Sequence, residues 1–207
     1  MTNKTKKGII HIGANIGQER GQYGSLNVLW IEPIPSVFKQ LVLNIKNFPT
    51  QTALNYLISD VDEKEYDFYV SNQSDRSSFL KFTDHHFSDP KFSHKETLTL
   101  RSIRMDSLIK KHKINLNDYD TLITDCQGSD FFVLKSFGED INHFSYVKSE
   151  VMISEIYEGF KDESAINQYL NSKGFELISN QKYFVNNTQR DNIYKNRNIE
   201  DLENDKS

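Results

Sequence analysis

The stretch that decides the fold, Ile9–Pro35, reads IIHIGANIGQERGQYGSLNVLWIEPIP. It holds an apolar run, a loop with Gly13 and Gly17, a second apolar run, and Glu32 directly before Pro33. Short apolar runs bounded by turn residues are typical of buried strands. A glycine-containing loop between two such runs predicts the start of an α/β protein with a parallel sheet.

The remaining sequence continues this alternation. A helical apolar spacing over 36–48 predicts a helix with Ser36 as its N-cap, and a helix beginning at Glu163 should stop at Gly174 and lead into a strand. Two further helices are expected at 105–114 and at 129–137, the latter with Ser129 or Asp130 near its N-terminus. Further strands are expected at 52–59, 65–72, 96–103, 120–126, 146–153 and 191–196, with 65–72 and 96–103 forming a β-hairpin. The pattern predicts a doubly wound α/β sheet.

Composition excludes several classes of protein. With 207 residues and 37% hydrophobic residues, the chain is expected to form one globular domain. A net charge of −4 gives no basic footprint for nucleic acid or an anionic membrane surface. The single cysteine, Cys126, permits no intramolecular disulfide and fits a reducing, cytoplasmic location. We recognise no signal peptide, and no apolar run approaches the ~18 residues of a membrane span.

The loop after the first strand predicts a ligand site, because ligands of such folds bind at the carboxyl ends of the strands. Gly13 and Gly17 permit a tight turn and a close approach of a ligand, and a helix starting near 16–18 would direct its amides at that ligand. Glu32 can accept two hydrogen bonds from a ribose diol. Asn15 stands where a dinucleotide fingerprint needs its second glycine, which opposes a nicotinamide dehydrogenase. The alternative is a purely structural turn.

Between Ile9 and Lys195, a series of segments resembles the FkbM-type S-adenosylmethionine-dependent methyltransferases in order and spacing. These segments are HIGANIGQE, VLWIEPIP, SDRSSFL, LITDCQGSDFFVLKSF, VKSEV, EIYEG, YLNSKGF and RDNIYK. The resemblance implies a single-domain, Rossmann-like class I methyltransferase fold. Its mostly parallel seven-stranded sheet would carry helices on both faces and a small β-hairpin insertion. This domain would span 7–195, and a polar, flexible tail would follow at 196–207.

The resemblance also implies S-adenosylmethionine as the methyl donor. The turn at 13–15 would hold its methionine end, Glu32 its ribose, and the pair at 59–60 its adenine, while Asp125 and Gln127 would lie beside the reacting methyl. The complete set of expected cofactor-binding residues is His11, Gly13, Ala14, Asn15, Gly17, Glu32, Pro33, Ser59, Asp60, Asp125 and Gln127.

Three residues are candidates for catalysis. Asp125 ends the fourth strand of the expected sheet, where a carboxylate could act as the base for a hydroxyl; it could instead cap the following helix. Glu150 could line the acceptor pocket or pair with Lys148. His86, beside His85 in a polar aromatic loop, could form a lid or acceptor wall, or be a surface residue.

Three positions depart from the family pattern. His11 replaces an aspartate, Ile123 replaces a lysine, and the shorter Asp130 replaces a glutamate. The carboxylates at 125, 130 and 150 form no recognisable ligand motif, so no metal is expected.

The activity implied by the resemblance is methyl transfer to a hydroxyl of a sugar, a glycan or a related small molecule. The alternative is a catalytically inactive, nucleoside-binding Rossmann-like module, for which the substitutions at His11 and Ile123 would be the signs.

Overall fold

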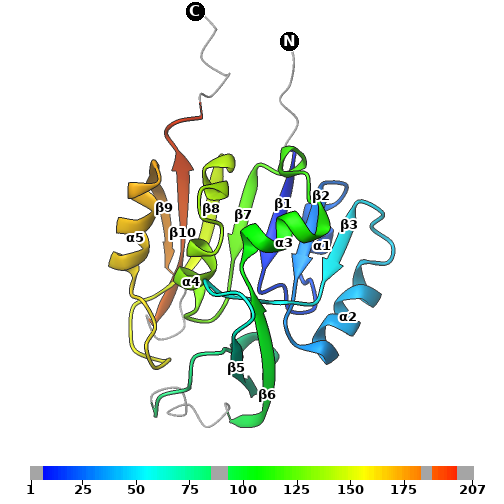
Figure 1. Ribbon diagram of the computed structural model, residues 1–207, viewed down its shortest axis with the longest axis vertical. Helices are drawn as coiled ribbons and strands as arrows, with labels where there is room; N and C mark the ends of the chain where they lie inside the picture. Colours follow the sequence, from blue (N-terminus) through cyan, green and yellow to red (C-terminus); the bar gives the residue numbers. More distant parts are fainter. Residues whose placement is uncertain (1–6, 85–92, 183–187, 200–207) are drawn as a thin grey trace, which may run out of the picture.

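The first apolar run forms a central strand of a seven-stranded sheet in the computed structural model (Figure 1). The structure describes residues 7–84, 93–182 and 188–199. In spatial order the strands are β3 (Gln51–Leu54), β2 (Asn27–Ile31), β1 (Gly8–Ile12), β7 (Thr121–Thr124), β8 (Tyr146–Met152), β10 (Gln189–Asn196) and β9 (Phe175–Lys182). β10 pairs antiparallel with both of its neighbours, and the other pairings are parallel.

Apolar residues on both faces explain why the strands read as continuous hydrophobic runs. All five residues of β1 are buried, which is the pattern of a parallel strand covered on both sides. Helices lie along both faces of the sheet. They are α1 (Arg20–Tyr23), α2 (Pro35–Ile45), α3 (Met105–His112), α4 (Asp130–Lys135) and α5 (Glu163–Ser172), with short 3₁₀ turns η1 (Ser74–Arg76), η3 (Leu116–Asp118) and η4 (Asp140–His143).

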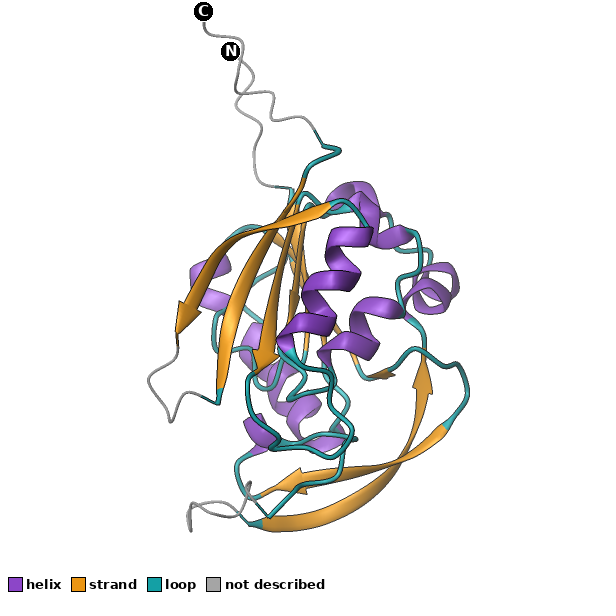
Figure 2. Ribbon diagram, turned by 90° about the vertical axis from the view of Figure 1, so that its left-hand side faces the viewer, coloured by secondary structure: helices purple, strands orange, loops and turns teal. Residues whose placement is uncertain are grey.

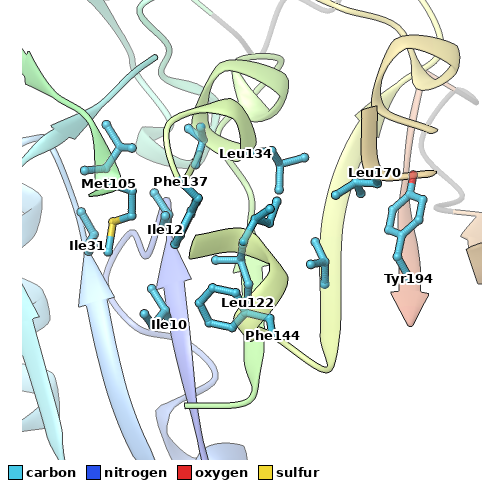
Figure 3. Packing of buried hydrophobic residues seen from close by; sticks show 14 of the residues in the cluster. Ile10, Ile12, Ile31, Met105, Leu122, Leu134, Phe137, Phe144, Leu170 and Tyr194 are labelled. Atoms are coloured by element: carbon cyan, nitrogen blue, oxygen red, sulfur yellow. The ribbon is translucent and has the colours of Figure 1, made fainter. Parts of the chain in front are cut away.

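The larger core lies between the sheet and α3, α4 and α5, and a smaller core lies under α1 and α2 on the opposite face. Figure 3 shows side chains of the larger core meeting from strands and helices, among them Ile10, Ile12, Ile31, Met105, Leu122, Leu134, Phe137, Phe144, Leu170 and Tyr194. These cores confirm the expected α/β architecture with helices on both faces. None of the helices in the described part of the chain is long and apolar enough to cross a membrane.

The β-hairpin insertion is also confirmed. β5 (Glu65–Ser71) and β6 (His94–Ile103) pair antiparallel, and β4 (Leu57–Ile58) adds to β6 in parallel. Figure 2 shows this hairpin extending beyond one end of the main sheet.

The single strand expected at 52–59 is wrong, because the chain divides it between two sheets. β3 belongs to the main sheet, whereas β4 belongs to the hairpin sheet. Asn55 lies between them, and its side-chain amide donates to the carbonyl oxygens of Glu32 (2.7 Å) and Pro33 (3.0 Å). These hydrogen bonds hold Asn55 at the carboxyl end of β2, so β3 ends just before it.

Two expectations about helix starts are also wrong. α1 begins at Arg20, not near 16–18, and has only four residues, because Gly21 weakens it and Gly24, with φ of 55°, ends it. The N-cap of α2 is Ile34 and not Ser36, since Pro35 takes the first helical position that proline favours.

At the end of the described chain, β10 extends to Asn196, one residue past the expected domain boundary.

Candidate active site

A pocket of about 880 Å³, part of it open to solvent, lies where β1, β2 and β7 end. Its lining comes from the loops after these strands, from the segment around β4, from β5 and from η1. The lining residues are His11, Ile12, Gly13, Ala14, Asn15, Gln18, Glu19, Glu32, Pro33, Ile34, Tyr56, Leu57, Ile58, Phe68, Ser74, Asp75, Ser77, Asp125, Cys126, Gln127, Ser129 and Val133. Eight of the expected site residues therefore meet in one pocket.

Glu32 is held rigidly at the end of β2. Its two carboxylate oxygens accept backbone amides from Asn15 (2.9 Å) and Ile34 (2.9 Å), so the side chain joins the first loop to the start of α2. A carboxylate has about four acceptor positions, which leaves capacity for a ligand's hydroxyl groups. Burial raises the pKa of Glu32 to about 7, although both amides oppose that shift.

Gly13 has a φ of 81°, in agreement with the expected tight turn. The expected reason for the missing side chain needs correction. A Cβ on Gly13 would lie 1.9 Å from the carbonyl oxygen of Asp125, so it would collide with the protein's own backbone and not only with a ligand. Gly17 lies outside the pocket lining, and a Cβ there would meet the Leu41 side chain at 2.7 Å.

His11 supplies a neutral polar group to the pocket wall. Its ring stacks on Trp30 with a centroid separation of 5.0 Å, and its Nδ1 lies 3.1 Å from the Tyr23 hydroxyl. Burial, with a smaller contribution from Lys148, lowers the pKa of His11 to about 3. The imidazole is therefore uncharged at neutral pH and adds no negative charge to the site.

Asp125 and Glu150 form a pair of carboxyl groups joined by Gln127. The Gln127 Nε2 donates to Asp125 Oδ1 (2.8 Å) and to Glu150 Oε2 (2.8 Å), and Gln189 donates to Glu150 Oε1 (2.7 Å). Asp125 is accessible from the pocket, whereas Glu150 is buried and lies outside the lining. The pair thus presents one carboxyl to a ligand and keeps the other behind it.

The two carboxyl groups differ in their protonation. Desolvation by the surrounding protein atoms raises the pKa of Asp125 to about 6, although the side chain can be reached from the pocket. Burial, followed by the charge of Asp125, raises the pKa of Glu150 well above its usual range. The two shifts favour an ionised Asp125 beside a protonated Glu150. Two neighbouring carboxyl groups whose pKa values are pushed apart can take different roles, and here the ionised Asp125 is the one that can act as a base.

Asp130, the first residue of α4, bonds the loop that leads into the helix, whose N-cap side chain makes no capping hydrogen bond. Both of its carboxylate oxygens lie 3.2 Å from the backbone amide of Cys126. Ser129, one of the two residues expected near this helix start, is the N-cap residue of α4, but its hydroxyl donates to the carbonyl oxygen of Cys126 (2.6 Å). The side chain of Asp125 is bound by Gln127 instead.

Comparison with known proteins agrees with this geometry. The family model of the methyltransferase FkbM domain matches residues 11–177. The chain belongs to the FkbM methyltransferase family. No curated protein matches it.

Three solved structures resemble this FkbM chain in fold. Aeropyrum pernix fibrillarin, solved with natively bound S-adenosyl-L-methionine, has a TM-score of 0.53 and 11% identity over 90% of this chain and 65% of its own. Magnesium protoporphyrin IX methyltransferase from Synechocystis PCC 6803, solved with S-adenosylhomocysteine, has a TM-score of 0.51 and 10% identity over 93% of this chain and 75% of its own. A protein of the NADB-Rossmann superfamily from Streptococcus agalactiae has a TM-score of 0.50 and 9% identity over 94% of this chain and 64% of its own. The chain therefore spans less than two thirds of the first and third of these proteins.

The hairpin insertion of the FkbM domain contributes a wall that the sequence did not predict. Ser74 on η1 donates its hydroxyl to Asn15 Oδ1 (3.0 Å), and the Tyr157 hydroxyl lies 3.1 Å from the carbonyl oxygen of Arg76. Asp75 also lines the pocket. The polar run around Ser74 was the available signal, but only the fold brings it to the first loop.

The serine pair of the same insertion orders its loop. Ser77 Oγ accepts the amide of Ser71 (3.1 Å), and Ser78 Oγ accepts that of Leu80 (3.1 Å). Ser77 also lines the pocket. The two histidines of the expected lid, His85 and His86, lie outside the described residues.

Ser59 and Asp60 do not line the pocket, contrary to expectation. The Ser59 hydroxyl lies 3.0 Å from that of Tyr66, and Asp60 forms an ion pair with Lys135 (3.1 Å). The division of the expected third strand turns both residues away. An apolar wall takes their place, formed by Tyr56, Leu57, Ile58 and Phe68.

Within the described ranges, no group of three or more His, Cys, Asp or Glu side chains is placed to hold a metal ion.

Proposed function

We propose that this FkbM domain is an S-adenosylmethionine-dependent O-methyltransferase whose acceptor is a hydroxyl of a sugar, a glycan or a related small molecule. The observation that carries the proposal is the accessible carboxylate of Asp125 in the pocket lining, which Gln127 joins to the buried carboxyl of Glu150 behind it. Family membership supports the methyltransferase activity, and two structures of similar fold were solved with S-adenosylmethionine or S-adenosylhomocysteine.

The pocket's residues fit the chemistry of S-adenosylmethionine. Glu32 retains acceptor capacity for the ribose hydroxyls, and the apolar wall that includes Leu57 and Phe68 suits a planar base. Glu19 and Asp125 bring negative charge to a pocket that would hold a cationic sulfonium. The bound donor would supply its methyl group as an electrophile.

A base beside the acceptor favours a hydroxyl as the methylated group. An alcohol is a weak nucleophile until its proton is removed, and a positioned base contributes roughly 10²–10⁴-fold to such a step. Asp125 would take the proton from the acceptor oxygen as the new carbon–oxygen bond forms. The neutral amide of Gln18 and the hydroxyl of Ser74 suit a neutral, polyhydroxylated acceptor.

Methyl-labelled S-adenosylmethionine and a panel of neutral sugars and glycosides test the proposal. We expect label in at least one acceptor, with one S-adenosylhomocysteine formed for each methyl transferred. The matched control is the same sugar already O-methylated or deoxygenated at the modified position, which should take no label. Transfer only to amines would contradict the O-methyltransferase assignment, and donor binding without transfer to any acceptor would favour the inactive nucleoside-binding module.

A further inference from the structure

Gln127 lies at the centre of the acidic pair and has every polar atom of its amide engaged. Its nitrogen reaches both carboxyl groups at 2.8 Å, and its Oε1 lies 3.0 Å from the Tyr157 hydroxyl. The backbone of Gln127 has a φ of 51°, which is unusual for a residue with a side chain. A strained backbone and a saturated amide indicate a side chain whose orientation is fixed.

Tyr157 fixes that orientation from the opposite side. The residue is buried, and its hydroxyl lies within hydrogen-bond distance of both Gln127 Oε1 and the Arg76 carbonyl oxygen on η1. Burial raises the pKa of Tyr157 well above its usual range, so the hydroxyl remains a donor. The ring packs against Gly128, where an added Cβ would lie 2.9 Å from a ring carbon.

We propose that Tyr157 is a positioning residue that holds the Gln127 amide with both donor hydrogens directed at Asp125 and Glu150, tying the η1 wall to the acidic pair. The inference rests on the proposed function, because it assigns Tyr157 to the orientation of the base in that reaction. Tyr157 itself is not part of the pocket lining and acts only through Gln127, which lines the pocket.

The direction of the effect follows from the hydrogen bonds. If the Gln127 amide rotates, its oxygen faces the two carboxyl groups, and Asp125 loses a donor that stabilises its charged form. Asp125 should then bind its proton more tightly. Lys148 on β8, Asp191 on β10 and Asp130 on α4 also act electrostatically within this cluster, and they remain unchanged in the variants below.

The test compares Tyr157→Phe, Gln127→Met and the double variant by ¹³C-carboxyl titration of Asp125 in the ligand-free protein. Tyr157→Phe keeps the ring against Gly128 and should raise the proton affinity of Asp125 about three- to tenfold. Gln127→Met should raise the proton affinity of Asp125 by about tenfold or more. The double variant should show the same proton affinity as Gln127→Met alone. Tyr169→Phe is the matched control, because its hydroxyl donates to the Leu134 carbonyl oxygen (3.3 Å) away from the pocket.

Two outcomes would overturn the inference. One is an Asp125 titration that is unchanged in Tyr157→Phe. The other is a shift of the Asp125 titration by Tyr157→Phe that is as large in the Gln127→Met background as in the unmodified protein. Calorimetric titration with S-adenosylmethionine should give affinities within about threefold of the unmodified protein for the Tyr157→Phe and Tyr169→Phe variants. The carboxyl titration requires neither donor nor acceptor, so it separates this inference from a failure of the proposed function.

Discussion

Replacing Asp125 by asparagine should lower turnover on a hydroxyl acceptor by roughly 10²-fold or more, with little change in affinity for S-adenosylmethionine. Asparagine keeps the size of the side chain and an oxygen that can accept from Gln127 (2.8 Å), but it cannot take up the acceptor's proton. The loss should therefore fall on the transition state and leave donor binding nearly intact.

The pH dependence sharpens this prediction. Because the base must be ionised, turnover of the unmodified protein should rise as the pH passes the Asp125 pKa of about 6. Steady-state rates between pH 5 and pH 8 should show this rise, and the Asp125→Asn variant should lack it. The control is Asp67→Asn, which removes an exposed carboxylate from β5. Unchanged turnover in Asp125→Asn would exclude it as the base and direct attention to Glu150 and His86.

Replacing Gly13 by alanine should destabilise the whole domain as well as the pocket. The new Cβ would lie 1.9 Å from the Asp125 carbonyl oxygen, at a φ of 81°. The strained φ and the overpacking together should cost about 3 kcal/mol or more. For a chain of this size the melting temperature should fall by roughly 6–12 °C. Thermal unfolding followed by circular dichroism measures the change.

Gly21→Ala is the control for that prediction. Gly21 lies in α1 with nothing within 4 Å of an added Cβ, so alanine there should leave stability unchanged or slightly higher. If Gly13→Ala melts at the temperature of the unmodified protein, the close contact between the ends of β1 and β7 is not as the structure describes it.

The sequence allowed the central strands and the first side of the pocket to be predicted. Alternating apolar runs and the placement of Gly13 and Glu32 are local properties of the chain, and the parallel sheet brings them to one edge. Asp125 could be anticipated in the same way, since it directly follows β7.

Other parts of the site could not be predicted from the sequence, because they depend on contacts between residues that are distant along the chain. The displacement of Ser59 and Asp60 follows from the bonds of Asn55 to the backbone after β2, which no local pattern records. The steric reason for Gly13 lies in the backbone of Asp125, more than a hundred residues away. Tyr157 reaches Gln127 only because the loop after β8 folds back over the N-terminus of α4. The sequence around Tyr157 indicated a loop over the site or a plain turn, but not this contact.

Calorimetric titration of the unmodified protein and Glu32→Ala with S-adenosylmethionine, and separately with NAD, tests the central claim most directly. We predict that the unmodified protein binds S-adenosylmethionine and not NAD. Affinity should fall roughly 10- to 100-fold in Glu32→Ala, since an acceptor for both ribose hydroxyls is lost. Circular dichroism must show that the variant is folded, because Glu32 also accepts two backbone amides. Binding of NAD in preference to S-adenosylmethionine, or equal affinity of a folded Glu32→Ala variant, would contradict the account.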